Sequence, residues 1–202
     1  MKNQINIKSL LVLPVFIAGA LFMATSCSES KTSDSREVAK EENIARLASN
    51  NQTIVVVEND NDTQFLMDAA EMQLEEINLG KLAQQKGTSP QVKELGKIME
   101  DDHTKALNEL KALAQSKSVT IPTSITNDSK DVYEKLADKT GNDFDEAYSD
   151  LMVEHHEDAI DLFEKGSTDS KDAEIRAWAS QKLAGLRTHL VKVEALENNM
   201  KK

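Results

Sequence analysis

The chain has 202 residues, a formal net charge of −11 and one cysteine, Cys27. The acidic charge argues against nucleic acid as a partner, because nucleic-acid-binding domains usually carry a basic face. One cysteine excludes a disulfide within the chain. We expect most of the negative charge simply to keep the surface solvated.

Residues 1–26 have the pattern of an export signal. Lys2 and Lys8 form a basic start, and the apolar run that follows is shorter than the roughly 20 residues of a membrane-spanning helix. The residues just before Cys27 resemble the lipobox of bacterial lipoproteins, although Ala24 stands where leucine is commoner. We therefore predict that Cys27 is acylated. The alternative is a plain signal followed by an incidental cysteine.

Residues 27–61 are expected to form a flexible tether. The segment is polar and charged and lacks aromatic residues, so it cannot bury enough apolar area to offset the entropy of ordering. We expect the helical turn at 44–48 and the β-branched run at 53–57 to be transient. Together with acylation, this predicts a domain held off a membrane in the bacterial cell envelope. We expect the outer membrane, with the domain facing the periplasm or the surface.

Residues 62–202 are predicted to form an all-α domain. Apolar residues recur at steps of three and four in four segments, 63–86, 89–113, 142–166 and 171–198. Ser89 and Pro90 suit the start of the second helix as N-cap and first helical residue. Two connections are short, and a long one over 116–142 contains a short helical stretch at 130–138. One long crossover is typical of ferritin-like proteins, so we predict an antiparallel four-helix bundle of that type.

Polar residues interrupt the apolar stripes of these helices. The chain has four histidines, all in three of the predicted helices, and a carboxylate interrupts the stripe of the first helix. Imidazoles and carboxylates aimed into a helical core are the ligands of a transition-metal site. We predict a site for Zn, Fe or Cu formed by Glu76, His103, His156 and His189, with Asp102, Glu100 and His155 as second choices.

The pattern of a di-iron site is incomplete. Such sites use Glu-x-x-His on two helices. Glu100 and His103 have this spacing, but Gly185 and Leu186 stand where the last helix would need its glutamate. The alternative to a metal site is a polar core in which each histidine bonds a neighbour and fixes helix register. No nucleophile elbow, phosphate loop or Cys-x-x-Cys pair occurs, so no catalytic residue is predicted and a hydrolase is a distant third.

The helical part of the chain resembles a known family. Six stretches in the family's order carry the resemblance: Phe65–Ala70, Glu76–Ala83, Ser89–Val92, Met99–Thr104, His156–Phe163 and Leu186–Leu190. They are similar to a bacterial ferritin-like domain of unknown function whose members are often labelled outer membrane proteins. The resemblance implies an exported four-helix bundle with polar positions at Glu76, Asp102, His103, His156 and His189. It supplies no activity. We expect an envelope lipoprotein that binds metal or acts in stress response, or else an interaction module whose protein partner is unknown.

Overall fold

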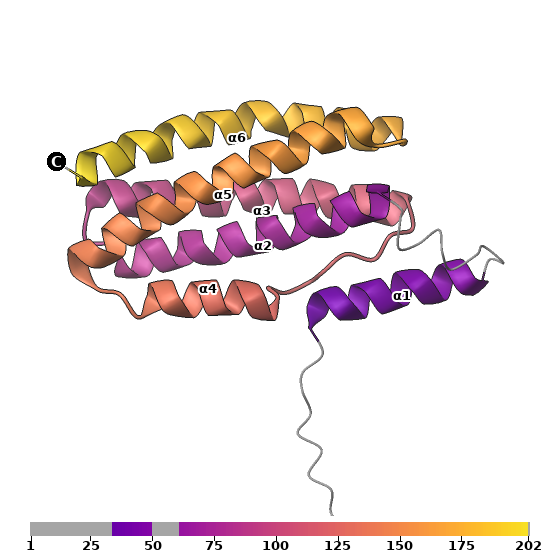
Figure 1. Ribbon diagram of the computed structural model, residues 1–202, viewed down its shortest axis with the longest axis horizontal. Coiled ribbons are helices and arrows are strands. Elements are labelled where there is room, and N and C mark those ends of the chain that lie inside the picture. The colour runs from indigo at the N-terminus through magenta and orange to yellow at the C-terminus, as the bar shows by residue number, and fades with distance from the viewer. Residues whose placement is uncertain (1–33, 50–60, 202) are drawn as a thin grey trace, which may run out of the picture. The chain divides into compact units, whose positions relative to one another are not determined.

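The protein is described here by a computed structural model that covers residues 34–49 and 61–201. All regular structure in this part of the chain is helical (Figure 1). The predicted signal, Cys27 and residues 53–57 lie outside the described residues. None of the described helices is long and apolar enough to cross a membrane. The helices are α1 (Ser35–Ser49), α2 (Asn61–Lys86), α3 (Pro90–Ser116), α4 (Asn127–Ala137), α5 (Gly141–Asp169) and α6 (Ala173–Met200).

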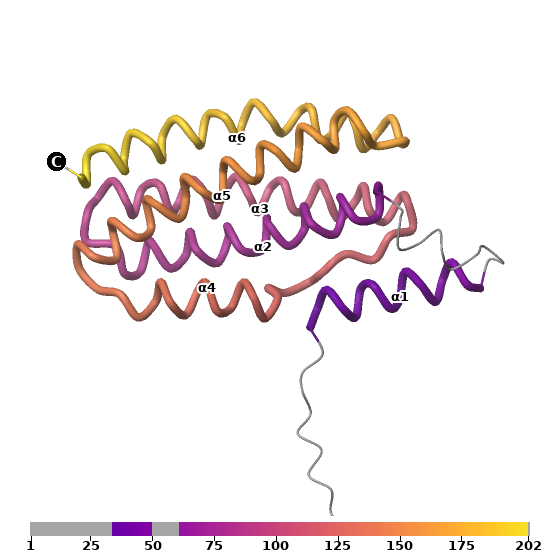
Figure 2. Tube along the Cα trace, in the orientation of Figure 1, coloured from indigo at the N-terminus to yellow at the C-terminus, as the bar shows by residue number. Residues whose placement is uncertain are grey.

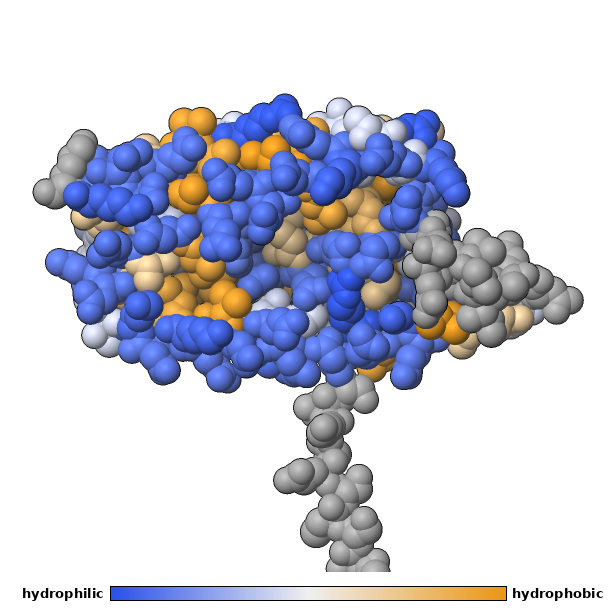
Figure 3. All heavy atoms as spheres, in the orientation of Figure 1, coloured by the Kyte–Doolittle hydropathy of each residue, from blue (hydrophilic) through white to orange (hydrophobic). Residues whose placement is uncertain are grey.

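The all-α prediction is confirmed, and the four long helices α2, α3, α5 and α6 pack together. α2 lies along α3 and α5 lies along α6, with further contacts of α2 with α5 and of α3 with α6. The start of α3 agrees with the sequence prediction. The Ser89 side chain accepts hydrogen bonds from the backbone N–H groups of Gln91 and Val92, and Pro90 is the first helical residue. Figure 3 shows one face of the molecule as mainly hydrophilic, with smaller apolar areas between, which agrees with a solvated exterior.

One helix end differs from the prediction. We expected α5 to stop at Gly166, but it continues to Asp169. A Cβ on Gly166 would overlap the aromatic ring of Phe65. This glycine therefore makes room for an aromatic side chain of α2, and its role is packing rather than ending a helix.

The core consists of two separate hydrophobic clusters. One contains the aromatic residues Phe65, Phe163 and Trp178. The other contains Phe144 and Tyr148, whose rings stack with their centroids 6.2 Å apart. Each cluster takes residues from all four long helices, so the helices are held together at two levels.

Buried polar residues lie between these clusters. On α3, for example, His103 stands between Met99 of one cluster and Leu107 of the other. The same order holds on α5 and α6. On α2, Glu76 stands between Leu74 and Ile77 of the first cluster, three residues before Leu79 of the second. Each long helix therefore places a polar side chain near the boundary. We call this set the polar layer: Glu76, His103, His156 and His189, all at most 6% exposed.

Two glycines let α2 and α3 approach closely. A Cβ on Gly96 would lie 2.6 Å from the carbonyl oxygen of Gly80 and 2.8 Å from the Cβ of Ala83. A Cβ on Gly80 would lie 2.6 Å from the carbonyl oxygen of Gly96. Backbone is therefore packed against backbone here, one to two turns from Glu76 and His103.

The expectation of a flexible segment is corrected for residues 35–49, which form α1. Composition suggested disorder because the segment has few apolar residues. It is held instead by polar contacts. The buried Asn43 side chain donates to the carbonyl of Thr120 and accepts from its N–H, both at 2.8 Å. Arg36 pairs with Asp68 and Glu71 of α2. Figure 2 shows the segment between α3 and α4 that α1 contacts.

The space around two glycines predicts that alanine substitutions there have opposite effects on stability. Gly96→Ala should lower the free energy of unfolding by about 1–3 kcal/mol, because the added methyl group overpacks the seam. Gly185, on α6, has nothing within 4 Å of an added Cβ. Gly185→Ala should therefore raise stability by about 0.5–1 kcal/mol through helix propensity. Urea unfolding measures both, and a stabilising Gly96→Ala would contradict the seam.

Candidate metal centre

Three histidines from three helices meet in the polar layer. His103 comes from α3, His156 from α5 and His189 from α6. Their ring centroids are 5.7 Å apart for His103 and His156, and 5.4 Å apart for each of the other two pairs. One ring nitrogen of each lies within 4.8 Å of the others. We call these residues the histidine trio.

Each imidazole of the trio bonds an acceptor through one nitrogen. His103 Nδ1 lies 2.7 Å from Gln73 Oε1, and His156 Nδ1 lies 2.8 Å from the carbonyl oxygen of Met152. His189 Nε2 lies 3.0 Å from a carboxylate oxygen of Asp102. These oxygens only accept, so each bonded nitrogen carries the hydrogen. In a neutral ring the opposite nitrogen is then left with a lone pair.

The opposite nitrogens are the ones without partners. His103 Nε2, His156 Nε2 and His189 Nδ1 are all buried, and none hydrogen-bonds another described residue. A metal-binding imidazole usually donates its second N–H to a carbonyl or carboxylate, which fixes its tautomer and orientation. All three members of the trio have this arrangement.

The protonation states also suit a metal. Burial lowers the pKa of His103 to about 4, although the nearby Glu76 carboxylate acts in the opposite direction. Burial likewise lowers the pKa of His156. Both rings are therefore neutral near pH 7. Neutral imidazole is the form that binds metal, because a protonated ring has no free lone pair.

Glu76 lies beside the trio and pairs with a fourth histidine. Its Oε1 lies 3.1 Å from Nδ1 of His155, while its Oε2 is buried and has no partner among the described residues. Burial would raise the pKa of this carboxyl. The hydrogen bond from His155 and the electrostatic influence of His156 and His103 outweigh burial and lower the pKa to about 2. Glu76 is therefore a buried negative charge near the trio.

The structure shows which of the two adjacent histidines of α5 points into the core, a question that the sequence left open. His156 is 1% exposed and belongs to the trio. His155 faces Glu76 instead. Burial lowers its pKa, but the hydrogen bond and the charge of Glu76 outweigh this, and the net shift is upward. His155 thus acts as the partner of a buried carboxylate.

The remaining candidates take other positions. Asp102 has a 60% exposed side chain and bonds His189, so it orients a ring of the trio. Glu100 accepts from the Gln84 side chain at 2.7 Å and lies away from the trio. Gln73 was missed. It precedes Glu76 by one helical turn, and this second polar residue on the buried face is the signal that could have found it.

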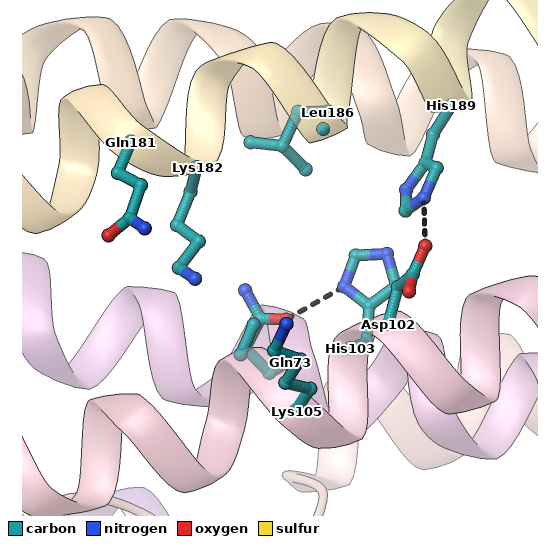
Figure 4. Close-up of a pocket in the computed structure, with 10 residues that line it drawn as sticks. Gln73, Asp102, His103, Lys105, Gln181, Lys182, Leu186 and His189 are labelled. Carbon is teal, nitrogen blue, oxygen red and sulfur yellow. Dashed lines mark hydrogen bonds and ion pairs between the residues drawn. The ribbon is translucent and has the colours of Figure 1, made fainter.

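A pocket of about 250 Å³ opens beside the trio, between α3 and α6 (Figure 4). His103 and His189 line it, with Gln73 and Asp102 close by. Metal sites need an entry path. The pocket borders two of the three imidazoles, and His156 is not among the residues that line it.

Comparison with known proteins assigns the chain to a family. The model of a domain of unknown function, DUF4142, matches residues 44–196. The chain belongs to this family. The expected resemblance to a domain of unknown function is confirmed at that level. No curated protein matches the sequence.

Two solved structures share the fold of this DUF4142 domain. A DUF305 fragment from Deinococcus radiodurans has a TM-score of 0.61 and 13% identity, over 69% of this chain and 96% of the fragment. A structure described as CopM in the Cu(I)-bound form has a TM-score of 0.58 and 19% identity, over 68% of this chain and 96% of that one. At these identities the similarity concerns the fold alone.

The lowered pKa of His103 predicts loss of stability in acid. The unfolded chain takes up a proton near the ordinary pKa of 6.5, whereas folded His103 does so only near pH 4. Its contribution is therefore complete above pH 6.5 and is lost as the pH falls toward 4, by about 3 kcal/mol in total. Urea unfolding of the metal-free protein between pH 7 and pH 4 measures this loss.

His103→Gln should reduce the acid loss, because the substituted side chain does not titrate. His155→Gln is the control. The pKa of His155 is raised, so its contribution is present in acid and lost as the pH rises above its folded pKa. The loss between pH 6.5 and 4 should therefore persist in this variant. An unchanged acid loss in His103→Gln would contradict the assignment.

Proposed function

We propose that this DUF4142 domain binds a transition-metal ion through His103, His156 and His189. One observation carries the proposal: three buried imidazoles each bond an acceptor on one side and hold an unpartnered nitrogen on the other. A buried polar atom without a partner costs about 1–3 kcal/mol. A single ion would give all three nitrogens a partner at once.

Copper is the metal that we favour, with zinc second. Imidazole suits Cu, Zn and Fe, and copper forms the tightest complexes among the divalent first-row metals. A fold neighbour is described as Cu(I)-bound, which supports this choice. Glu76 would add a negative charge near the cation. Iron ranks last, because a di-iron site needs carboxylates that α5 and α6 do not bring to the trio.

We further propose that the four long helices form a ferritin-like bundle and that the chain is an envelope lipoprotein. The long connection between α3 and α5 supports the first point. The basic start, the apolar run and Cys27 support the second.

A polar core that fixes helix register is the second candidate function. The bonds of the trio to Gln73, Asp102 and the Met152 carbonyl favour it, since they also hold the rings without metal.

Metal titration separates these two functions. His189→Gln should weaken copper binding by about tenfold or more, because it removes one of three ligands and leaves the other two buried. His155→Gln is the matched control, since it removes a neighbouring imidazole outside the trio. Both proteins are prepared from residue 28 onward without a histidine tag. Competitive titration with Cu(II), and with Cu(I) and Zn(II) separately, gives the affinities. Equal affinities in the two variants would favour the polar core.

Anchoring is tested by fractionation. Cys27→Ala, expressed with its signal in a Gram-negative host, should move the protein from the membrane to the soluble fraction, because the acyl chains supply the membrane affinity. Ser28→Ala should stay with the membrane. Membrane retention of Cys27→Ala would mean that the chain is held there by something other than a lipid on this residue.

A further inference from the structure

The pocket beside the trio is rich in hydrogen-bond donors. Lys105, Lys182, Gln73 and Gln181 line it, together with the apolar Ala106 and Leu186. Asp102 is the one carboxylate among the lining residues, and it already bonds His189. Lys182 pairs with Glu109 and lies 6.0 Å from the centroid of the Trp178 ring. The polar atoms that face this space therefore mainly donate.

Gln73 contributes a buried donor. The residue is 1% exposed, and its Oε1 faces Nδ1 of His103. The amide nitrogen must then point the other way, and Figure 4 shows it turned toward the pocket on the side of Lys182. It donates to the sulfur of Met72 at 3.8 Å, which is a weak acceptor. The Gln73 amide thus has a hydrogen available for a ligand.

The charge of the lysines favours an anionic ligand for the pocket. Lys182 is already paired with Glu109. The exposed ammonium group of Lys105 does not help a cation to stay in the pocket, but it attracts an anion. Three histidines leave an ion with an open coordination position, as in zinc sites that take water or substrate as the fourth ligand. The pocket reaches His103 and His189. A ligand in it would therefore lie beside two of the proposed ligands of the ion, the Gln73 amide and a lysine.

From this arrangement we infer that the metal-loaded centre takes a small carboxylate anion from this pocket as an additional ligand. The inference rests on the proposed metal binding and gives the site a ligand class. A carboxylate has two acceptor oxygens, so one can reach the ion while the other accepts from Gln73 or a lysine. A cavity of about 250 Å³ has room for a molecule of this kind.

Gly185 provides a way to fill the pocket without disturbing the trio. It lines the cavity, and a Cβ there meets nothing within 4 Å. Gly185→Leu should therefore occupy the pocket and remain compatible with the helix. Ala184→Leu is the matched control, because this neighbouring position on α6 is exposed and is not among the pocket residues.

The experiment uses residues 28–202 loaded with Cu(II). Acetate is titrated into this protein, and the visible absorption and the electron paramagnetic resonance spectrum are followed. Wild type and Ala184→Leu should show a saturable spectral change. Gly185→Leu should bind acetate about tenfold more weakly, as expected when a group blocks a preformed site, with copper affinity unchanged. Lys105→Met should weaken acetate binding about threefold, the effect of one exposed charge, while Lys111→Met should not.

The outcomes separate the two proposals. If copper does not bind to the trio in stoichiometric amount, the proposed function fails and the ligand inference fails with it. If copper binds but acetate leaves the spectra unchanged, only the ligand inference is overturned. It is also overturned if acetate affects the two leucine variants equally, since the anion would then bind elsewhere. Copper content measured after gel filtration shows that acetate has not simply removed the metal.

Discussion

Buried polar atoms in the middle of a helical core need partners, and this requirement governs the organisation of the domain. Water cannot reach most of the polar layer, and a polar atom left without a hydrogen bond there costs free energy. The two hydrophobic clusters above and below carry the packing of the helices. They allow the layer between them to hold polar groups that an apolar core would exclude. The Gln73 side chain and the Met152 carbonyl accept hydrogen bonds from imidazole N–H groups of this layer.

The arrangement leaves an imbalance that points to a cation. Glu76 is ionised and fully buried, and His155 compensates its charge on one side only. Its Oε2 has no partner in the part of the chain that the structure describes, and neither have three imidazole nitrogens close by. The carboxylate oxygen is an acceptor, and so is each of these nitrogens when its ring is neutral. Adding protons would partly satisfy them, but the lowered pKa values of His103 and His156 oppose this near neutral pH. A metal ion supplies positive charge without that penalty.

Much of this organisation was readable from the sequence, and the rest was not, for physical reasons. The apolar stripes and the Ser89-Pro90 signal predicted the long helices, because these patterns reflect local geometry. The histidines were found because they interrupt those stripes. The choice between His155 and His156 depends on how α5 is rotated, which two adjacent residues on one stripe do not decide. The Met152 carbonyl has no side-chain signal at all. The helix α1 was missed because Asn43 binds backbone atoms far along the chain, and composition does not report such contacts.

The seam between α2 and α3 links the fold to the site. Gly80 and Gly96 bring two backbones together, and Gln73 on one helix bonds His103 on the other. If α2 and α3 lay further apart, this hydrogen bond would lengthen and the His103 ring could rotate. The bond would then no longer keep the hydrogen on Nδ1. His156 is held within its own helix, and His189 is held by the exposed Asp102. The three rings are thus fixed to different degrees, with His189 the least enclosed and the pocket at its side. This difference suits a site in which His103 and His156 are already in position and His189 completes the coordination as the ion enters. A protein that binds metal only in its folded state is also stabilised by that metal, so the cost of an incompletely bonded polar layer would be recovered when the ion is present.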